Sequence, residues 1–261
     1  MNDADVLIDL INKREKLVAM LAPSFPIVFS YPTIITMLKK LGFVYTVEVA
    51  VGAKKTNEEL LALMKANSNA RYITSPCPTI VRMIKKQMPD NAGYLTPGVD
   101  SPMAATAKIV AQRYPDYRPV FIGPCIMKKI EAKEDCPELH ILVLTYTELL
   151  QVFSHFNIQE ETNPSDHFDI AEPGTTRLYA LDGGLAHSSG IANMLPKGAV
   201  KIVSGAQENI SAIQEFDTNP NIRLLDILNC PGGCIGGPGI NSPLTREERK
   251  NKIVAYMSKN L

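Results

Sequence analysis

The sequence has no apolar stretch near the roughly 18 residues that a membrane-spanning helix needs. Its first residues, Met-Asn-Asp-Ala-Asp, contain neither the basic nor the apolar region of a signal peptide. The 27 basic and 27 acidic residues give a net charge of +0, so no basic surface for nucleic acid or membrane lipid is indicated. We therefore expect a cytoplasmic protein that binds neither nucleic acid nor a membrane.

Cysteine and histidine are also scarce. The five cysteines are an odd number, which argues against a disulfide framework. The four histidines show no metal-ligand spacing, and His187, which follows two glycines closely, is the only one that we expect near a cavity. The chain has no internal repeat and no low-complexity tract. With 45% hydrophobic residues, 261 residues can build one large core or two closely packed lobes.

Most of the cysteines lie in three short segments with unusual neighbours. Residues 74–78 are Thr-Ser-Pro-Cys-Pro, and residues 123–131 are Gly-Pro-Cys-Ile-Met-Lys-Lys-Ile-Glu. Residues 230–239 are Cys-Pro-Gly-Gly-Cys-Ile-Gly-Gly-Pro-Gly. Four thiols brought together would have the ligand count of a cubane iron–sulfur cluster or of a structural zinc site. The four candidate metal ligands are Cys77, Cys125, Cys230 and Cys234.

The spacing favours an iron–sulfur cluster over zinc. Zinc sites tend to take their cysteines from local pairs, whereas only Cys230 and Cys234 are close in this sequence. The glycines after Cys230 remove side chains, so the backbone could approach a group larger than one zinc ion. Four buried thiols without a metal are the third interpretation, because free cysteine is among the most buried residue types.

Short β-branched or apolar runs alternate with segments of helical spacing, which predicts an α/β chain with mostly parallel sheets. We expect an exposed loop at residues 159–176 and a helix within residues 2–16. The predicted strands are residues 17–22, 44–49, 120–122, 140–144, 200–203 and 223–228. The predicted helices are residues 34–41, 58–66, 79–87, 103–113, 147–156 and 207–216.

We expect these elements to form two packed lobes, residues 1–115 and 116–261, with mostly parallel or mixed sheets flanked by helices. The cysteine segments follow predicted strands, and open α/β sheets bind their ligands at the carboxyl ends of the strands. A metal cluster would therefore lie in the cleft between the lobes.

The three cysteine segments resemble the signature segments of the iron-only (FeFe) hydrogenases, in the same order. Residues 22–24, 101–103 and 182–184 also resemble segments that line the active site in that family, so the resemblance covers nearly the whole chain. It implies that the four cysteines hold a four-iron four-sulfur cluster. It also implies that Cys234 bridges to a diiron unit with carbon monoxide, cyanide and dithiolate ligands. Together these groups form the H-cluster, which interconverts protons, electrons and dihydrogen.

The resemblance gives roles to other residues. Lys128 matches the lysine that donates a hydrogen bond to one cyanide, and Glu131 would orient it. Ser24 matches the residue at the other cyanide, and Pro23 and Pro102 match the wall of the diiron site. Without the resemblance, Lys128 would be a solvated helix residue paired with Glu131 at i, i+3. Ser24 would then be a helix N-cap, a role compatible with the first one.

The sequence departs from efficient hydrogenases at the residues that handle protons. Pro76 stands where those enzymes have a cysteine that passes protons to the diiron unit, and proline has no donor on its side chain or nitrogen. Loss of a positioned proton donor costs about 10²–10⁴ in rate. Ala62 stands where a second acidic relay residue is expected after Glu58 or Glu59. Such changes are typical of the sensory branch of the family, so we expect a slow or sensory enzyme.

Other departures are compatible with the same family. Gly123 and Leu228 stand where many members have methionines, and leucine is tolerable there by volume. Cys136 matches no ligand, and we expect it to be a loop cysteine without a role in the site. The sequence has no second set of four cysteines for further clusters. Electrons would therefore come from a ferredoxin or a ferredoxin-like domain, and hydrogenase maturation proteins would insert the diiron unit.

The alternative function is a hydrogenase-like protein that keeps only the four-iron four-sulfur cluster, with a role in assembly or redox sensing. Relatives of that kind usually carry extra N-terminal cluster cysteines and lose the lysine. This chain has no cysteine before Cys77 and keeps Lys128. A zinc-stabilised interaction module is a third interpretation, which the glycine-rich segment disfavours.

Overall fold

The computed structural model describes residues 2–162 and 164–259 as a mixed α/β protein with two parallel sheets. The strands are β1 Leu17–Leu21, β2 Tyr45–Glu48, β3 Tyr72–Ile73, β4 Arg118–Gly123, β5 Leu142–Thr145, β6 Val200–Ser204 and β7 Leu224–Leu228. The α-helices are α1 Asp3–Asn12, α2 Thr33–Leu41, α3 Ala50–Ala66, α4 Pro78–Gln87, α5 Pro102–Arg113, α6 Met127–Glu134, α7 Tyr146–His155, α8 Gly184–Ser188, α9 Ile191–Met194, α10 Ala206–Thr218 and α11 Arg246–Met257. The 3-10 helices are η1 Phe25–Ile27, η2 Pro89–Tyr94, η3 Pro137–Leu139, η4 Thr175–Ala180 and η5 Cys234–Gly236.

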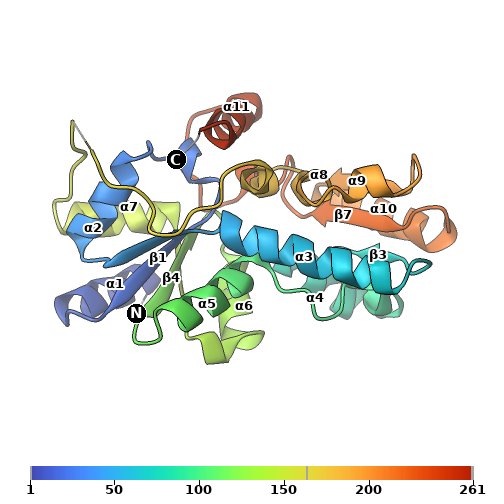
Figure 1. Cartoon of the computed structure of the whole chain (residues 1–261), viewed down its shortest axis with the longest axis horizontal. Helices are drawn as coiled ribbons and strands as arrows, with labels where there is room; N and C mark the ends of the chain where they lie inside the picture. The colour runs from blue at the N-terminus through green and yellow to red at the C-terminus, as the bar shows by residue number, and fades with distance from the viewer. Residues whose placement is uncertain (1, 163, 260–261) are drawn as a thin grey trace.

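All strands pair in parallel, as the sequence predicted. The larger sheet has the order β2-β1-β4-β5, and the smaller one has the order β3-β7-β6. In Figure 1 the larger sheet lies on the left of the molecule and the smaller one on the right, with α3 extending between them. The α/β fold class is thus confirmed.

The two faces of the larger sheet carry separate apolar layers because successive strand residues point to opposite sides. Leu17, Ala19 and Leu21 of β1 pack with α1, α2 and α7. Val18 and Met20 of the same strand pack with α5 and residues of α6. Both faces are buried, which explains why β1 is an uninterrupted apolar run and not an alternating one.

The smaller sheet is covered in the same way. One face packs on α4 and α10, and the other packs on α3, η4 and α8. Helices α3 and α5 approach so closely at Gly52 that a Cβ there would lie 2.3 Å from the Pro102 carbonyl oxygen. This close contact holds the start of α5 beside the smaller sheet's helices.

The lobes formed by the sheets are not two consecutive segments of the chain. Strand β1 pairs directly with β4, and β3 pairs with β7. Each sheet therefore draws strands from both sides of the boundary that we placed between residues 115 and 116. A parallel neighbour needs a crossover connection, and here the crossovers pass from one sheet to the other.

The segment expected to be an exposed loop, residues 159–176, has no regular element before η4, and its residue 163 lies outside the described residues. The segment is anchored at Ile170, which bridges to Val47 of β2. The next anchor is Arg177, whose Nε lies 2.7 Å from Glu48 Oε1 with both side chains fully buried. Arg177 also donates to the carbonyl of Tyr256 in α11. Through its ion pair and this hydrogen bond, Arg177 joins the edge of the larger sheet to the last helix.

The expected helix within residues 2–16 is α1, which packs against α7 and β5 with Leu7 completely buried. It is thus part of the core and not a loose linker. No helix among the described residues is long and apolar enough to cross a membrane.

Candidate metal centre and its cavity

Each cysteine segment directly follows a parallel strand. Cys77 ends the loop after β3 and precedes α4, Cys125 comes two residues after β4, and Cys230 comes two residues after β7. Cys234 begins η5. The two sheets thus contribute the carboxyl ends of their strands to one region, as expected for ligand sites in open α/β folds.

The four thiols are close enough to influence one another electrostatically. Burial, followed by the charges of Cys125 and Cys77, raises the pKa of Cys230 to about 11. Burial and the charges of Cys125, Cys77 and Cys230 also raise the pKa of Cys234. Thiolates in such a place need a compensating cation, because metal ligands must be deprotonated and a bound metal supplies the positive charge. The donor set therefore fits a cationic metal group.

A single-ion site is not formed by the side chains as they lie. Across residues 2–162 and 164–259, no group of three or more His, Cys, Asp or Glu side chains would hold one metal ion. A zinc ion would need its sulfur ligands at about 2.3 Å.

The glycines of the third segment have a role within the fold itself. Gly232 and Gly233 have φ angles of 80° and 93°, which other residues rarely adopt. A Cβ on Gly233 would lie 2.6 Å from the Asp182 backbone nitrogen, and one on Gly237 would lie 2.7 Å from the Pro124 carbonyl oxygen. These glycines let the chain fold tightly against its own backbone.

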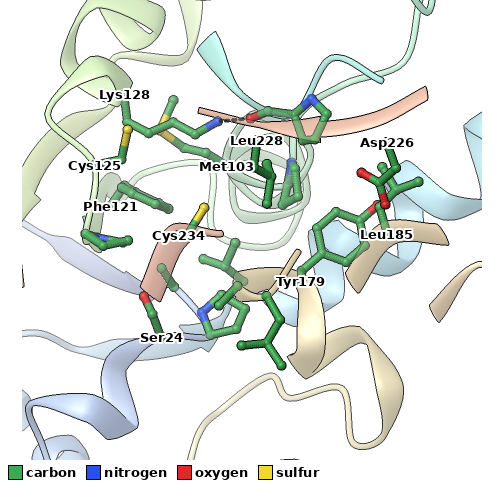
Figure 2. A pocket seen from close by; sticks show the side chains of 18 residues that line it. Ser24, Met103, Phe121, Cys125, Lys128, Tyr179, Leu185, Asp226, Leu228 and Cys234 are labelled. Carbon is green, nitrogen blue, oxygen red and sulfur yellow. Dashed lines mark hydrogen bonds between the residues drawn. The ribbon is translucent and has the colours of Figure 1, made fainter. Parts of the chain in front are cut away.

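A mostly apolar cavity of about 70 Å³ lies beside Cys125 and Cys234 (Figure 2). Six of the candidate cofactor-binding and catalytic residues line it, and they come from five separate loops and helices. The wall also contains Pro76 and Leu228. Those six residues are Pro23, Ser24, Pro102, Cys125, Lys128 and Cys234. Cys77, Cys230 and Glu131 are not among the lining residues of this cavity.

Lys128 is the cationic group of the cavity wall. Its Nζ donates to Glu131 Oε2 at 2.6 Å. It also donates to the Pro76 carbonyl oxygen at 3.2 Å, the dashed line at Lys128 in Figure 2. Burial opposes the charge of Lys128, but Glu131 more than offsets this, so the pKa of the ammonium is raised. Glu131 also accepts from the Ser101 hydroxyl. The predicted i, i+3 pair is present, but it is buried and not solvated.

Ser24 precedes η1, as an N-cap residue would, but its side chain makes no capping hydrogen bond. Its hydroxyl lies 2.7 Å from the Tyr146 hydroxyl, which in turn donates to the Ala22 carbonyl oxygen at 3.1 Å. Pro102 occupies the first turn of α5 after its N-cap Ser101. The rigid ends of β1 and α5 thus fix two parts of the wall.

Phe121 explains the glycine at position 123. Both residues belong to β4, and a Cβ on Gly123 would lie 2.6 Å from the Phe121 ring. Phe121 is buried and lines the cavity. Its ring therefore occupies the space that a methionine at position 123 would require. Nothing in the sequence pattern singled out Phe121, since it is one apolar residue in an apolar strand.

Asp226 was also missed by the sequence analysis. It lies in the middle of β7, is 2% exposed and lines the cavity. A charged residue inside the apolar run Leu-Leu-Asp-Ile-Leu was the available signal, because carboxylates are rarely buried without a partner. Tyr179 of η4 lies beside it in Figure 2, and its hydroxyl donates to Asn57 at 2.9 Å.

A second, more polar pocket is lined by Glu131, the ion-pair partner of Lys128. Ser101, Glu131 and Cys136 line it together with exposed charged residues. Cys136 lies in the short loop between α6 and η3, as expected, but it is buried, with its thiol donating to the Glu131 carbonyl oxygen. His187, expected near a cavity, is exposed on α8 and is not among the lining residues of the first cavity.

Comparisons with known proteins agree with this arrangement. The family model described as iron only hydrogenase large subunit, C-terminal domain, matches residues 15–238. The NADP-reducing hydrogenase subunit HndD of Solidesulfovibrio fructosivorans is 24% identical over 260 residues, which cover 77% of this chain and 44% of the relative. The chain thus spans less than half the length of that curated relative.

Solved structures of FeFe hydrogenases share the fold. One, from a study of stepwise H-cluster assembly, superposes with a TM-score of 0.77 at 18% identity and covers 99% of this chain and 89% of its own. A variant of an FeFe hydrogenase from Chlamydomonas reinhardtii has a TM-score of 0.77 at 17% identity with the same coverage. The resemblance noted in the cysteine segments is confirmed, and the chain belongs to the iron-only hydrogenase large subunit, C-terminal domain family.

Proposed function

We propose that this chain binds an H-cluster and interconverts protons, electrons and dihydrogen, slowly or in a sensory role. One observation carries the proposal. Four partly buried thiols lie close enough to influence one another electrostatically, and two of them line an apolar cavity with a buried ammonium group in its wall. Cys77, Cys125, Cys230 and Cys234 would hold the four-iron four-sulfur cluster. Cys125 and Cys234 both line the cavity, and the family resemblance gives the bridging role to Cys234.

The diiron unit with its carbon monoxide, cyanide and dithiolate ligands would supply the metal site at which protons and electrons combine. The chain contributes the surroundings. Lys128 offers a fixed charged donor for an anionic ligand, and Glu131 holds its position. The apolar walls, with Pro23 and Pro102 among them, exclude water and strengthen such hydrogen bonds. Ser24 offers a hydroxyl on the opposite wall.

The low rate that we propose follows from Pro76. Its ring lines the cavity, and its carbonyl oxygen is occupied by Lys128. It presents no proton donor to the cavity. The expected proton relay that leads to position 76 is interrupted as well. Ala62 is exposed on α3 and has no acidic group, and Glu59 accepts a hydrogen bond from the Asp100 backbone nitrogen. Electrons would arrive from a ferredoxin or ferredoxin-like domain, and maturation proteins would insert the diiron unit.

Infrared spectroscopy of the protein reconstituted with iron, sulfide and a synthetic diiron complex tests the proposal. Bands from carbon monoxide and cyanide ligands that remain after removal of free complex are the expected result. A protein that keeps four irons and shows none of these bands would support the alternative, a cluster protein with a role in assembly or redox sensing.

Replacing Lys128 with alanine should leave the four-iron four-sulfur cluster intact and reduce the retained diiron unit several-fold, because the anionic ligand loses its buried donor. Electron paramagnetic resonance measures the cluster, and the infrared bands measure the diiron unit. Lys133→Ala, an exposed residue on the same helix, is the matched control.

Removing one partner of a buried ion pair costs about 3–5 kcal/mol, so Lys128→Ala could also loosen the fold. The double variant Lys128→Ala, Glu131→Gln removes the unpaired carboxylate and separates the two effects. A wild-type infrared spectrum in both variants would refute the donor role of Lys128.

A further inference from the structure

We propose that Asp226 is the group that exchanges protons between solvent and the cavity in this chain, in place of the thiol that Pro76 has removed. This inference rests on the proposed function. It concerns a residue to which neither the cysteine segments nor the family resemblance gave any role. The argument begins with the groups that the cavity wall contains.

The cavity wall offers few groups that could carry a proton. Cys125 and Cys234 are candidate metal ligands, and Lys128 is held in its ion pair with Glu131. The Ser24 hydroxyl also lines the wall, but it is hydrogen-bonded to the buried Tyr146 hydroxyl and not to an acidic group. Tyr179 lines the wall, but burial raises its pKa well above the usual value. Asp226 is the one carboxylic acid among the residues that line this cavity.

The carboxyl group of Asp226 accepts hydrogen bonds from two neutral donors and has no positively charged partner among them. The Ala186 backbone nitrogen donates to Oδ2 at 3.0 Å, and the Thr74 hydroxyl donates to Oδ1 at 3.4 Å. Neither partner is charged, and the side chain is 2% exposed. A buried carboxylate with two neutral donors is only partly compensated for the water it has lost. Its neutral, protonated form is correspondingly favoured.

The electrostatics agree with that geometry. Burial is the main cause that raises the pKa of Asp226 to about 6, and the Ala186 and Thr74 donors oppose it. His187 on α8 lowers the value and Asp182 before α8 raises it, while Tyr179 on η4 is the other titratable neighbour. A proton carrier works best when its pKa lies near the working pH.

The position of Asp226 suits a carrier between the cavity and solvent. Figure 2 shows it beside Tyr179 and Leu185, on the side of the cavity away from Cys125. Thr74 ties it to the loop that carries Pro76, two residues later. On its other side, Ala186 is followed directly by His187, which is exposed. The carboxyl group would give its proton to the group bound in the cavity and take another from solvent at the α8 side.

The first experiment uses the metal-free protein, so that it does not depend on the cluster. Carbon-13 NMR of labelled aspartate carboxyls should show one carboxyl signal whose chemical shift titrates near pH 6. This signal should be absent from the spectrum of Asp226→Asn. Asp217→Asn, which removes an exposed carboxyl on α10, should leave that signal in place. Titration of Asp226 near the ordinary value of about 3.9 would overturn the inference.

The second experiment uses protein loaded with both clusters, with infrared bands as proof of loading. Hydrogen evolution per loaded site should fall as pH rises through about 6, because only the protonated carboxyl can donate. Asp226→Asn should lower the rate by about 10²-fold and remove this pH dependence, and Asp226→Glu should restore part of both. Asp217→Asn should behave like wild type.

The outcomes separate the inference from the function on which it rests. Normal infrared bands together with an unchanged pH profile in Asp226→Asn would overturn the role of Asp226 alone. Absence of the bands in wild type would overturn the proposed function, and the role of Asp226 with it.

Discussion

Replacing Cys77, Cys125 or Cys230 with serine is expected to reduce bound iron from four atoms per reconstituted chain to nearly none. The three thiols follow strands β3, β4 and β7, which belong to two different sheets. The cluster would therefore cross-link segments that lie far apart in the sequence. A serine hydroxyl is much harder to deprotonate than a thiol, which makes it a weaker ligand of iron. Iron and sulfide analysis after reconstitution measures the effect.

Loss of the cluster should also lower the thermal midpoint of the reconstituted protein, since a group that binds only the folded state stabilises it. Cys136→Ser is a stringent control, because Cys136 is a buried cysteine of the same chain that lies on the second pocket. It should keep all four irons. Full iron content and unchanged stability in Cys77→Ser would remove Cys77 from the ligand set.

Much of the fold could be predicted from the sequence, because parallel strands buried on both faces are continuous apolar runs. β1 is of this kind, β7 is interrupted only by Asp226, and helix α2 beside β1 has clear amphipathic spacing. β3 has only two residues, too few for any periodicity. Helix α11 begins with Arg-Glu-Glu-Arg-Lys-Asn-Lys and buries only Ile253 and Tyr256, so its apolar pattern was too weak to identify.

The parts of the candidate site that contain cysteine, proline and glycine motifs could be predicted from the sequence. The parts formed by single apolar or aromatic residues could not. Proline, glycine and cysteine in three segments located Cys125, Cys234 and Lys128, which share one cavity. Phe121 and Tyr179 reach the same cavity through tertiary packing alone. The sequence also could not separate a glycine that makes room for a cluster from one that fits against backbone, as Gly233 does.

The assignment of strands to the two sheets could not be predicted from the sequence pattern, for a different reason. Alternating strands and helices predict parallel pairing, but they do not say to which of two sheets each strand belongs. The chain leaves the larger sheet after β2, enters the smaller one at β3 and returns at β4. A boundary drawn at residue 115 therefore could not separate the two lobes.

Pro76→Cys is expected to raise hydrogen evolution per loaded site by up to about 10²-fold. Pro76 lines the cavity, so a cysteine at this position would place a titratable thiol in the same wall. The hydrogen bond from Lys128 is to the carbonyl oxygen of residue 76, which the substitution keeps. The cationic side of the wall should therefore remain in place.

The gain would be limited by the rest of the route. Proline also restricts the loop that presents Cys77, so the new residue gives that ligand more freedom. Pro76→Ala loosens the loop in the same way without adding a thiol, which makes it the matched control. Ala62 is exposed on α3 and not in the wall of the cavity, so adding Ala62→Glu should increase the rate little beyond Pro76→Cys.

The coupling between substitutions at positions 76 and 226, measured on the rate of hydrogen evolution, tests whether the thiol and the carboxyl both supply protons to the cavity. If Asp226 carries protons in the wild-type chain, Asp226→Asn should cost about 10²-fold there but far less in the Pro76→Cys background, because the thiol offers a second route. Hydrogen evolution and loading by infrared, measured for the four proteins of this cycle, give the coupling between the two residues. Purely additive effects would mean that the thiol does not replace the carboxyl, and a wild-type rate equal to that of Pro76→Cys would refute the low-activity assignment of Pro76.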